Sequence, residues 1–166
     1  RWTILSQRIT PSYDNVVTVD DAFEVSVSEL VIWDNSIDRA VSSMKLPGSS
    51  DTLACISDDG KWAVVLIRRC MRQKATLARY SCSDWKIINT YFEDEDRRIS
   101  QIALCDGNLK LLSLHKGVEL WDIVTGKLLK QFPTSRRFDF RAPMDSFGCF
   151  PFAFLGSYDG FVSVID

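Results

Sequence analysis

The stretch that most constrains the fold runs over residues 109–132, because it holds three short apolar runs separated by two turns. The runs are residues 109–114, 118–121 and 128–132. The break at His115-Lys116-Gly117 between two such runs predicts a β-hairpin. Residues 122–127 predict a second turn, in which Thr125 supplies a side-chain acceptor and Gly126 a left-handed residue. Three strands in so short a stretch leave no room for a helix.

The same pattern recurs at three other places in the chain. Residues 80–91 align on residues 121–132 without a gap, residues 30–34 repeat the strand that ends in Trp-Asp, and residues 156–166 repeat the hairpin. The positions that align with Trp121 are Trp33, Tyr80 and Ile165, and we call these four residues the anchors. Successive anchors are 47, 41 and 44 residues apart. A period of about 44 residues with four strands per unit is typical of propeller blades.

With these landmarks the chain resembles the WD40-repeat family of β-propellers. The resemblance rests on Trp33-Asp34, Trp121-Asp122, the hairpin that contains Asp159-Gly160, and residues 57–62, which are similar to the family's usual turn between its first two strands. The family's Gly-His pair is absent at every expected site, and the only histidine is His115. The buried Asp-His-Ser-Trp hydrogen-bond set of the family therefore cannot form in its usual way, and only Asp159 occupies its hairpin position.

We therefore expect an all-β protein, a partial WD40-like β-propeller of about four divergent blades over residues 1–166. The expected blades are residues 9–46, 51–92, 98–132 and 138–166. Repeats of this kind need neighbours stacked on each side, and the family typically has about seven blades, which favours a piece of a larger propeller. The alternative is a closed four-bladed ring in which residues 2–5 supply the missing outer strand of the last blade.

Within these blades the pattern predicts particular strands and loops. The expected strands are residues 16–19, 23–27, 30–33 and 41–46; 52–56, 62–67, 75–80 and 86–91; 99–104 with the three runs of residues 109–132; and 138–140, 150–155 and 161–165. Residues 64–67 are a continuous apolar run, which predicts a strand buried on both faces between blades. Residues 68–74 are expected to form a long hairpin insertion, and residues 141–148 a loop.

Composition and charge exclude several classes of protein. The chain is 46% hydrophobic and 25% charged, which is typical of a globular domain. A net charge of −2 gives no overall field to recruit polyanions. Five cysteines without C-x-x-C spacing indicate neither a disulfide framework nor a zinc site, and favour a reducing, intracellular compartment, cytoplasm or nucleus. No apolar run approaches 18 residues, so we expect no membrane span, and we expect no metal and no cofactor.

Charged residues gather in loops that the resemblance places on one rim. The hairpin residues are Arg68, Arg69, Met71, Arg72, Lys74, His115 and Lys116, and the linker residues are Glu93, Asp94, Glu95, Asp96, Arg136 and Arg137. The basic hairpin suits an acidic motif of a partner protein, and the acidic run suits a basic one. The alternative interpretation is a set of solvated loops whose opposite charges neutralise each other.

No motif for catalysis is present. The chain has no phosphate-cradling glycine loop, no G-x-S-x-G and no H-E-x-x-H, and His115 has no serine or cysteine paired with it. The pairs Asp20-Asp21 and Asp58-Asp59 are expected to cap turns. Most tryptophans and cysteines are expected in the core.

We therefore expect a non-catalytic scaffold or recognition module that binds proteins or peptide motifs within a multiprotein complex. One alternative is an RNA- or DNA-associated subunit that uses the arginine-rich rim, which the acidic run on the same rim disfavours. Another is an enzymatic propeller. That would need polar side chains converging from the first strand of each blade, where the sequence offers little besides Ser100 and Gln101.

Overall fold

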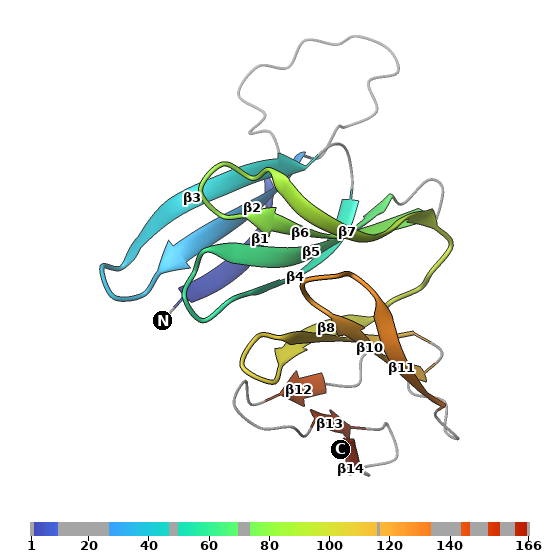
Figure 1. Ribbon diagram of the computed structural model, residues 1–166. Helices are drawn as coiled ribbons and strands as arrows, with labels where there is room; N and C mark the ends of the chain where they lie inside the picture. Colours follow the sequence, from blue (N-terminus) through green and yellow to red (C-terminus); the bar gives the residue numbers. More distant parts are fainter. Residues whose placement is uncertain are drawn as a thin grey trace, which may run out of the picture.

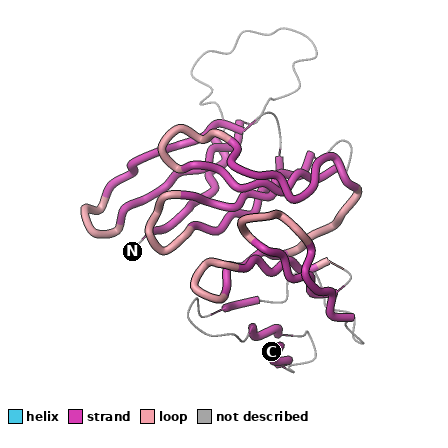
Figure 2. Tube along the Cα trace, viewed as in Figure 1, coloured by secondary structure: helices cyan, strands magenta, loops and turns pink. Residues whose placement is uncertain are grey.

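The computed structural model describes residues 2–9, 27–46, 50–69, 74–115, 117–133, 144–146, 153–156 and 162–165. The described residues form fourteen strands and no helix (Figures 1 and 2). All strands belong to antiparallel sheets in which neighbours in the chain are neighbours in the sheet. The expectation of an all-β protein is therefore confirmed.

The strands form four sheets in chain order. Sheet 1 holds β1 (Trp2–Ile9), β2 (Val27–Asp34) and β3 (Arg39–Leu46); sheet 2 holds β4 (Ser50–Ile56), β5 (Trp62–Arg69), β6 (Lys74–Ser81) and β7 (Ile87–Glu95). Sheet 3 holds β8 (Gln101–Cys105), β9 (Lys110–Leu114), β10 (Gly117–Asp122) and β11 (Leu128–Pro133); sheet 4 holds β12 (Met144–Ser146), β13 (Ala153–Gly156) and β14 (Val162–Ile165). Among the described residues the four sheets do not close into a ring.

Three of the anchors occupy the same backbone position in successive sheets. The pairing register shifts just before each of them, and each pairs with the residue seven positions further on: Trp33 with Ala40, Tyr80 with Ile87, and Trp121 with Leu128. The residue five positions after each anchor has a positive φ: Asp38 (49°), Trp85 (54°) and Gly126 (69°). The repeat read from the sequence is thus a repeated hairpin with a bulge. The fourth anchor, Ile165, lies in β14 opposite Ala153.

The aspartate of the Trp-Asp pair holds this hairpin together. Asp122 Oδ1 accepts hydrogen bonds from the backbone N–H groups of Val124 (3.1 Å) and Thr125 (2.6 Å) and from the Thr125 hydroxyl (2.8 Å). These bonds, the one from the Thr125 N–H first, hold the pKa of Asp122 below its ordinary value. Asp34 accepts in the same way from Ser36. Gly126 is left-handed, as predicted, but the main acceptor in the turn is Asp122 and not Thr125.

The core lies in layers between the sheets. Along β5, Ala63 and Val65 pack toward β2 of sheet 1, whereas Val64 and Leu66 pack toward β10 and its neighbours in sheet 3. All four are fully buried. This confirms the prediction of a strand covered on both faces.

In both pairs of neighbouring sheets, the same position of an outer strand bonds to the last hairpin of the next sheet. Trp85 Nε1 in the last hairpin of sheet 2 donates to Ser42 Oγ in β3 (2.8 Å), and Asn89 Nδ2 in β7 donates to the carbonyl of Val124 in the last hairpin of sheet 3 (3.2 Å). Ser42 and Asn89 both stand nine positions after an anchor. On the other side, β4 contacts both β1 and β8, and β8 contacts β12. Sheets 1 to 3 therefore stack by one repeated relation.

Two expectations for sheet 2 were wrong. Arg68 pairs with Ala75 and Arg69 with Lys74, so these residues lie in β5 and β6 and the expected insertion shrinks to residues 70–73. β7 continues to Glu95, so residues 93–95 are strand and not linker. A run of charges does not end a strand when its backbone groups remain paired and its side chains reach solvent or a polar partner.

The ends of the chain also differ from expectation. The strand that pairs with β2 is β1; residues 16–19 and most of 23–27, which were expected as the first two strands of this blade, lie outside the described residues together with Asp20-Asp21. Residues 2–5 pair with residues 31–34, so they do not supply an outer strand to the last sheet. In sheet 4, β12 lies within the expected loop 141–148, and the expected strand 138–140 lies outside the described residues.

We expect Gly126→Ala to destabilise the protein more than Gly107→Ala. Both glycines are left-handed, with φ of 69° and 60°, so both substitutions cost about 1 kcal/mol in backbone strain. A Cβ at Gly126 would stand 2.8 Å from Asn89 Nδ2, whereas a Cβ at Gly107 would meet nothing within 4 Å. Moving Asn89 weakens its bond to Val124, for a further cost of about 1 kcal/mol. Urea unfolding of both variants measures the difference, and equal values would contradict this contact between sheets.

Candidate functional site

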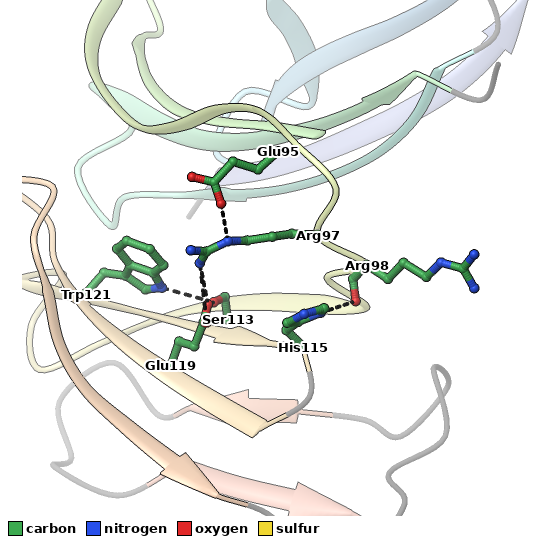
Figure 3. A network of polar contacts seen from close by, with 7 residues as sticks. All are labelled: Glu95, Arg97, Arg98, Ser113, His115, Glu119 and Trp121. Atoms are coloured by element: carbon green, nitrogen blue, oxygen red, sulfur yellow. Dashed lines mark hydrogen bonds and ion pairs between the residues drawn. The ribbon is translucent and has the colours of Figure 1, made fainter. Parts of the chain in front are cut away.

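A polar network that runs from the surface into the core lies between sheets 2 and 3, centred on Arg97. Figure 3 shows its guanidinium between the carboxylates of Glu95 and Glu119. Arg97 Nη1 is 3.3 Å from both carboxylate oxygens of Glu119, and Arg97 Nε donates to Glu95. The guanidinium also stacks over the rings of Phe92 (5.1 Å) and Trp121 (5.5 Å). Arg97 therefore joins the end of β7 to the face of sheet 3.

The network continues into sheet 3 because three side chains share one face. Ser113 in β9 and Glu119 in β10 are opposite each other, and Trp121 is two residues further along β10. The Ser113 hydroxyl donates to Glu119 Oε2 (3.0 Å) and accepts from Trp121 Nε1 (3.0 Å). Ser113, Glu119 and Trp121 are all buried. A charge this deep requires such partners, so removing one of them would leave the other buried and uncompensated.

His115 lies close to this network, and its side chain bonds to a backbone carbonyl group beside Arg97. Its Nδ1 lies 3.2 Å from the carbonyl oxygen of Arg98, which can only accept, so Nδ1 carries the proton (Figure 3). This bond ties the turn after β9 to the segment that follows Arg97.

The predicted rim residues differ in their contacts and in their exposure to solvent. Arg68 Nη1 donates to the carbonyl of Ile99 (3.2 Å) and is half-buried, so part of the expected basic hairpin is held between sheets. Lys74, Glu93, Glu95 and Asp96 are exposed. Only the backbone is described at Arg69 and Asp94, and the residues Met71, Arg72, Lys116, Arg136, Arg137, Asp159 and Gly160 lie outside the described residues.

One member of the acidic run has an ionic partner in the structure. Arg97 serves two carboxylates at once, those of Glu95 and the buried Glu119. Glu93 and Asp96 are exposed near this end of β7. The interpretation of mutually neutralised loops therefore has direct support at Glu95.

Sequence reasoning missed a row of exposed aliphatic side chains at the opposite end of the outer strands. Its members are Ile37 and Val41 in sheet 1, Ile87 and Ile88 in sheet 2, and Val124, Leu128 and Leu129 in sheet 3. The position eight residues after the anchor, held by Val41, Ile88 and Leu129, is shared by all three sheets. We call them the aliphatic row. Their exposed fractions run from 43% at Val41 and Leu128 to 65% at Val124. The signal in the sequence was the repeated aliphatic pair seven and eight positions after an anchor.

The cysteines in the described part of the chain lie where burial disfavours the thiolate. Burial raises the pKa of Cys55 to about 12 and that of Cys82 to about 11, and it also raises the pKa of Cys105. Few thiolates form at neutral pH under these conditions. Cys82 and Cys105 are buried, which confirms for them the expected place in the core.

Among the residues that the structure describes, no group of three His, Cys, Asp or Glu side chains could hold a metal ion. The same residues contain no helix with the length and apolarity needed to cross a membrane. No model of a known protein family matches the chain, and a search of curated proteins gives no match either.

Proposed function

We propose that the chain is an arc of a WD40-like β-propeller that works as a non-catalytic scaffold for other proteins inside the cell. The repeated hairpin with its anchor, and the repeated contact between sheets, support the propeller architecture. The chemistry of the described residues supports binding over catalysis, because the buried charges of Arg97 and Glu119 pair with each other and the surface combines aliphatic side chains with charges of both signs. Surface groups of this kind bind partner proteins through apolar and ionic contacts.

The observation that carries this proposal is the aliphatic row. Exposed aliphatic residues scattered singly are ordinary, but here one recurs at the same position of each of three stacked sheets, as Val41, Ile88 and Leu129. Repeated exposure of this kind is typical of a surface that a partner covers. The row lies at the start of β7 and β11, whereas the acidic end of β7 lies on the other rim. The partner-binding surface we favour is therefore opposite to the rim that the resemblance suggested.

The rim proposed from sequence remains a second docking surface, for a basic motif. Glu93 and Asp96 are available there, and Lys74 is exposed beside the hairpin of residues 70–73. The basic half of that rim is weaker than expected, because Arg68 bonds to Ile99. The use of Arg68 and Arg97 in contacts between sheets also disfavours the nucleic-acid alternative. Charge reversal at Arg68 is expected to lower thermal stability, so it cannot serve as a neutral test of docking.

We expect the double substitution Ile87→Thr and Leu128→Thr to release partners without unfolding the protein. Both side chains are exposed, at 57% and 43%, so the change in the free energy of unfolding should stay within about 0.5 kcal/mol. Cross-linking mass spectrometry of affinity-purified protein reads out the contacts. Links to partners should concentrate at Lys86 and Lys127, next to the row, and disappear in the variant.

Cross-links at Lys74, which lies on the opposite rim, provide the control for those at Lys86 and Lys127. The matched variant Glu93→Lys leaves the row intact and should keep the links at Lys86 and Lys127. If the row variant retains its partners, with links mainly at Lys74, the row is not the binding surface.

A further inference from the structure

Two turns of the described chain carry the same dipeptide at the same place in the fold. Asp59-Gly60 lies between β4 and β5, and Asp106-Gly107 lies between β8 and β9, so each pair joins the first two strands of its sheet. In such a pair the glycine nitrogen can attack the carboxyl carbon of the aspartate, and glycine hinders this attack least because it has no Cβ. The third Asp-Gly pair, Asp159-Gly160, lies outside the described residues.

The turn at Asp59 occupies both groups that would react. Asp59 Oδ1 accepts hydrogen bonds from the Ser57 hydroxyl (2.7 Å) and from the Lys61 N–H (3.1 Å). These bonds, the one from Ser57 first, hold the pKa of Asp59 below its ordinary value, which keeps the carboxyl group ionised. The Gly60 N–H, which would have to attack, donates to the carbonyl of Ser57 (2.9 Å). The reaction therefore needs the loss of several hydrogen bonds at this turn.

The turn at Asp106 leaves the same groups open. Asp106, Gly107 and Asn108 have positive φ (53°, 60° and 68°), and the Leu109 N–H closes the turn onto the Asp106 carbonyl (3.0 Å). The Gly107 N–H donates no hydrogen bond to any described residue, and the space around Gly107 is empty to 4 Å from an added Cβ. The Asp106 carboxylate pairs with Lys110 at 2.9 Å, but both side chains are exposed, so the pair restrains the carboxylate little.

We propose that Asp106-Gly107 is a site of aspartate-to-isoaspartate isomerisation, and that the contacts of Asp59-Gly60 protect that pair from it. The Gly107 nitrogen forms a bond to Asp106 Cγ, and the carboxyl hydroxyl leaves with the N–H proton as one water molecule. Water then adds to either carbonyl of the cyclic imide. Opening at one carbonyl restores aspartate, and opening at the other leaves the main chain running through the former side chain. The net change is an isomerisation that consumes no oxidant and no reductant.

The isomerisation would act on a contact between sheets 2 and 3. Isoaspartate lengthens the main chain by one carbon atom just before Asn108. Asn108 Nδ2 donates to Asp58 Oδ2 in the matching turn of sheet 2 (2.9 Å). The longer turn moves Asn108 relative to Asp58 and weakens this link between neighbouring sheets.

Incubation of the native full chain in water enriched in heavy oxygen (¹⁸O) tests the proposal, because each opening of the imide puts one solvent oxygen into the residue. Tryptic digestion in ordinary water then gives peptide 99–110, whose one acidic residue is Asp106, and peptide 46–61, which contains Asp59. Mass spectrometry with electron-transfer fragmentation locates the label and the isoaspartate. Peptide 99–110 should gain label at least about fivefold faster, because a backbone hydrogen bond must break first at the other turn. Equal rates, or no label in peptide 99–110, would overturn the proposal.

Two controls separate the fold from the dipeptide. In unfolding concentrations of urea the two peptides should gain label at rates within about twofold, because the protecting bonds are lost. A difference that persisted in urea would refute the protection. Asp106→Glu keeps the charge opposite Lys110 but would need a larger imide ring, so it should abolish labelling of peptide 99–110. Label that remained in this variant would show that the oxygen enters by another route and would refute the assignment to Asp106.

Discussion

Replacing Arg97 by methionine is expected to lower the free energy of unfolding by about 3 kcal/mol, because it strands a buried carboxylate. Glu119 has a side chain that is 4% exposed, and its described ionic partner is Arg97. Breaking one half of such a pair costs more than the pair itself contributes. The Arg97 side chain is 26% exposed, so solvent can partly replace it and the effect should fall at the low end of the usual range. Denaturant unfolding measures the change.

The matched double variant separates charge from packing. Arg97→Met with Glu119→Gln removes the stranded charge and keeps an acceptor for the Ser113 hydroxyl, so it should recover at least about 1 kcal/mol of the loss. Arg97→Lys keeps the charge but not the stacking on Phe92 and Trp121. Its free energy of unfolding should therefore lie between those of the parent and of Arg97→Met. If Arg97→Met proves neutral, the network is not what fixes sheet 2 against sheet 3.

Replacing Trp121 by alanine is expected to cost about 4 kcal/mol, whereas the same change at Trp33 should cost about 1 kcal/mol. The two anchors share a backbone position but not a side-chain environment. Trp121 is 4% exposed and packs against Tyr91 and Phe92. Trp33 is half-buried, and its Nε1 donates to Asp38 at 3.3 Å.

Trp121→Phe is the control for this comparison. Phenylalanine keeps most of the apolar contact and loses only the hydrogen bond from Nε1 to Ser113, so it should cost about 1–2 kcal/mol. Thermal and urea unfolding of the three variants give the order. Equal losses at Trp33 and Trp121 would mean that the anchors act through the repeated backbone alone and not through the core.

The repeat could be predicted from sequence because it is carried by local chemistry. The Trp-Asp pair, the aliphatic residues that follow it and the left-handed residue lie within one hairpin, so their spacing is visible in the chain. The structure confirms that hairpin three times, with the same bulge and the same pairing. The alternation along β10 held a further signal. It puts Glu119 on the same face as Trp121, and a carboxylate on a tryptophan face requires a buried partner.

Contacts between distant segments could not be predicted in this way. Nothing near Arg97 distinguishes it from the exposed charges beside it, because its partner Glu119 is 22 residues away and on the next sheet. Arg68 was assigned to a loop for the same reason, since its partner Ile99 is 31 residues away. The pairing of β1 with β2 spans residues 10–26, over which local pattern carries no information about which strands meet.

The sequence by itself determined the periodic unit: an all-β chain of short strands, turned by capped hairpins with an anchor in each. Only the tertiary structure decided which charges are used inside and which aliphatic side chains remain outside. The physical reason is that hairpin geometry depends on neighbours in the chain. Burial depends on what the adjacent sheet places opposite, and this is decided only when the sheets stack.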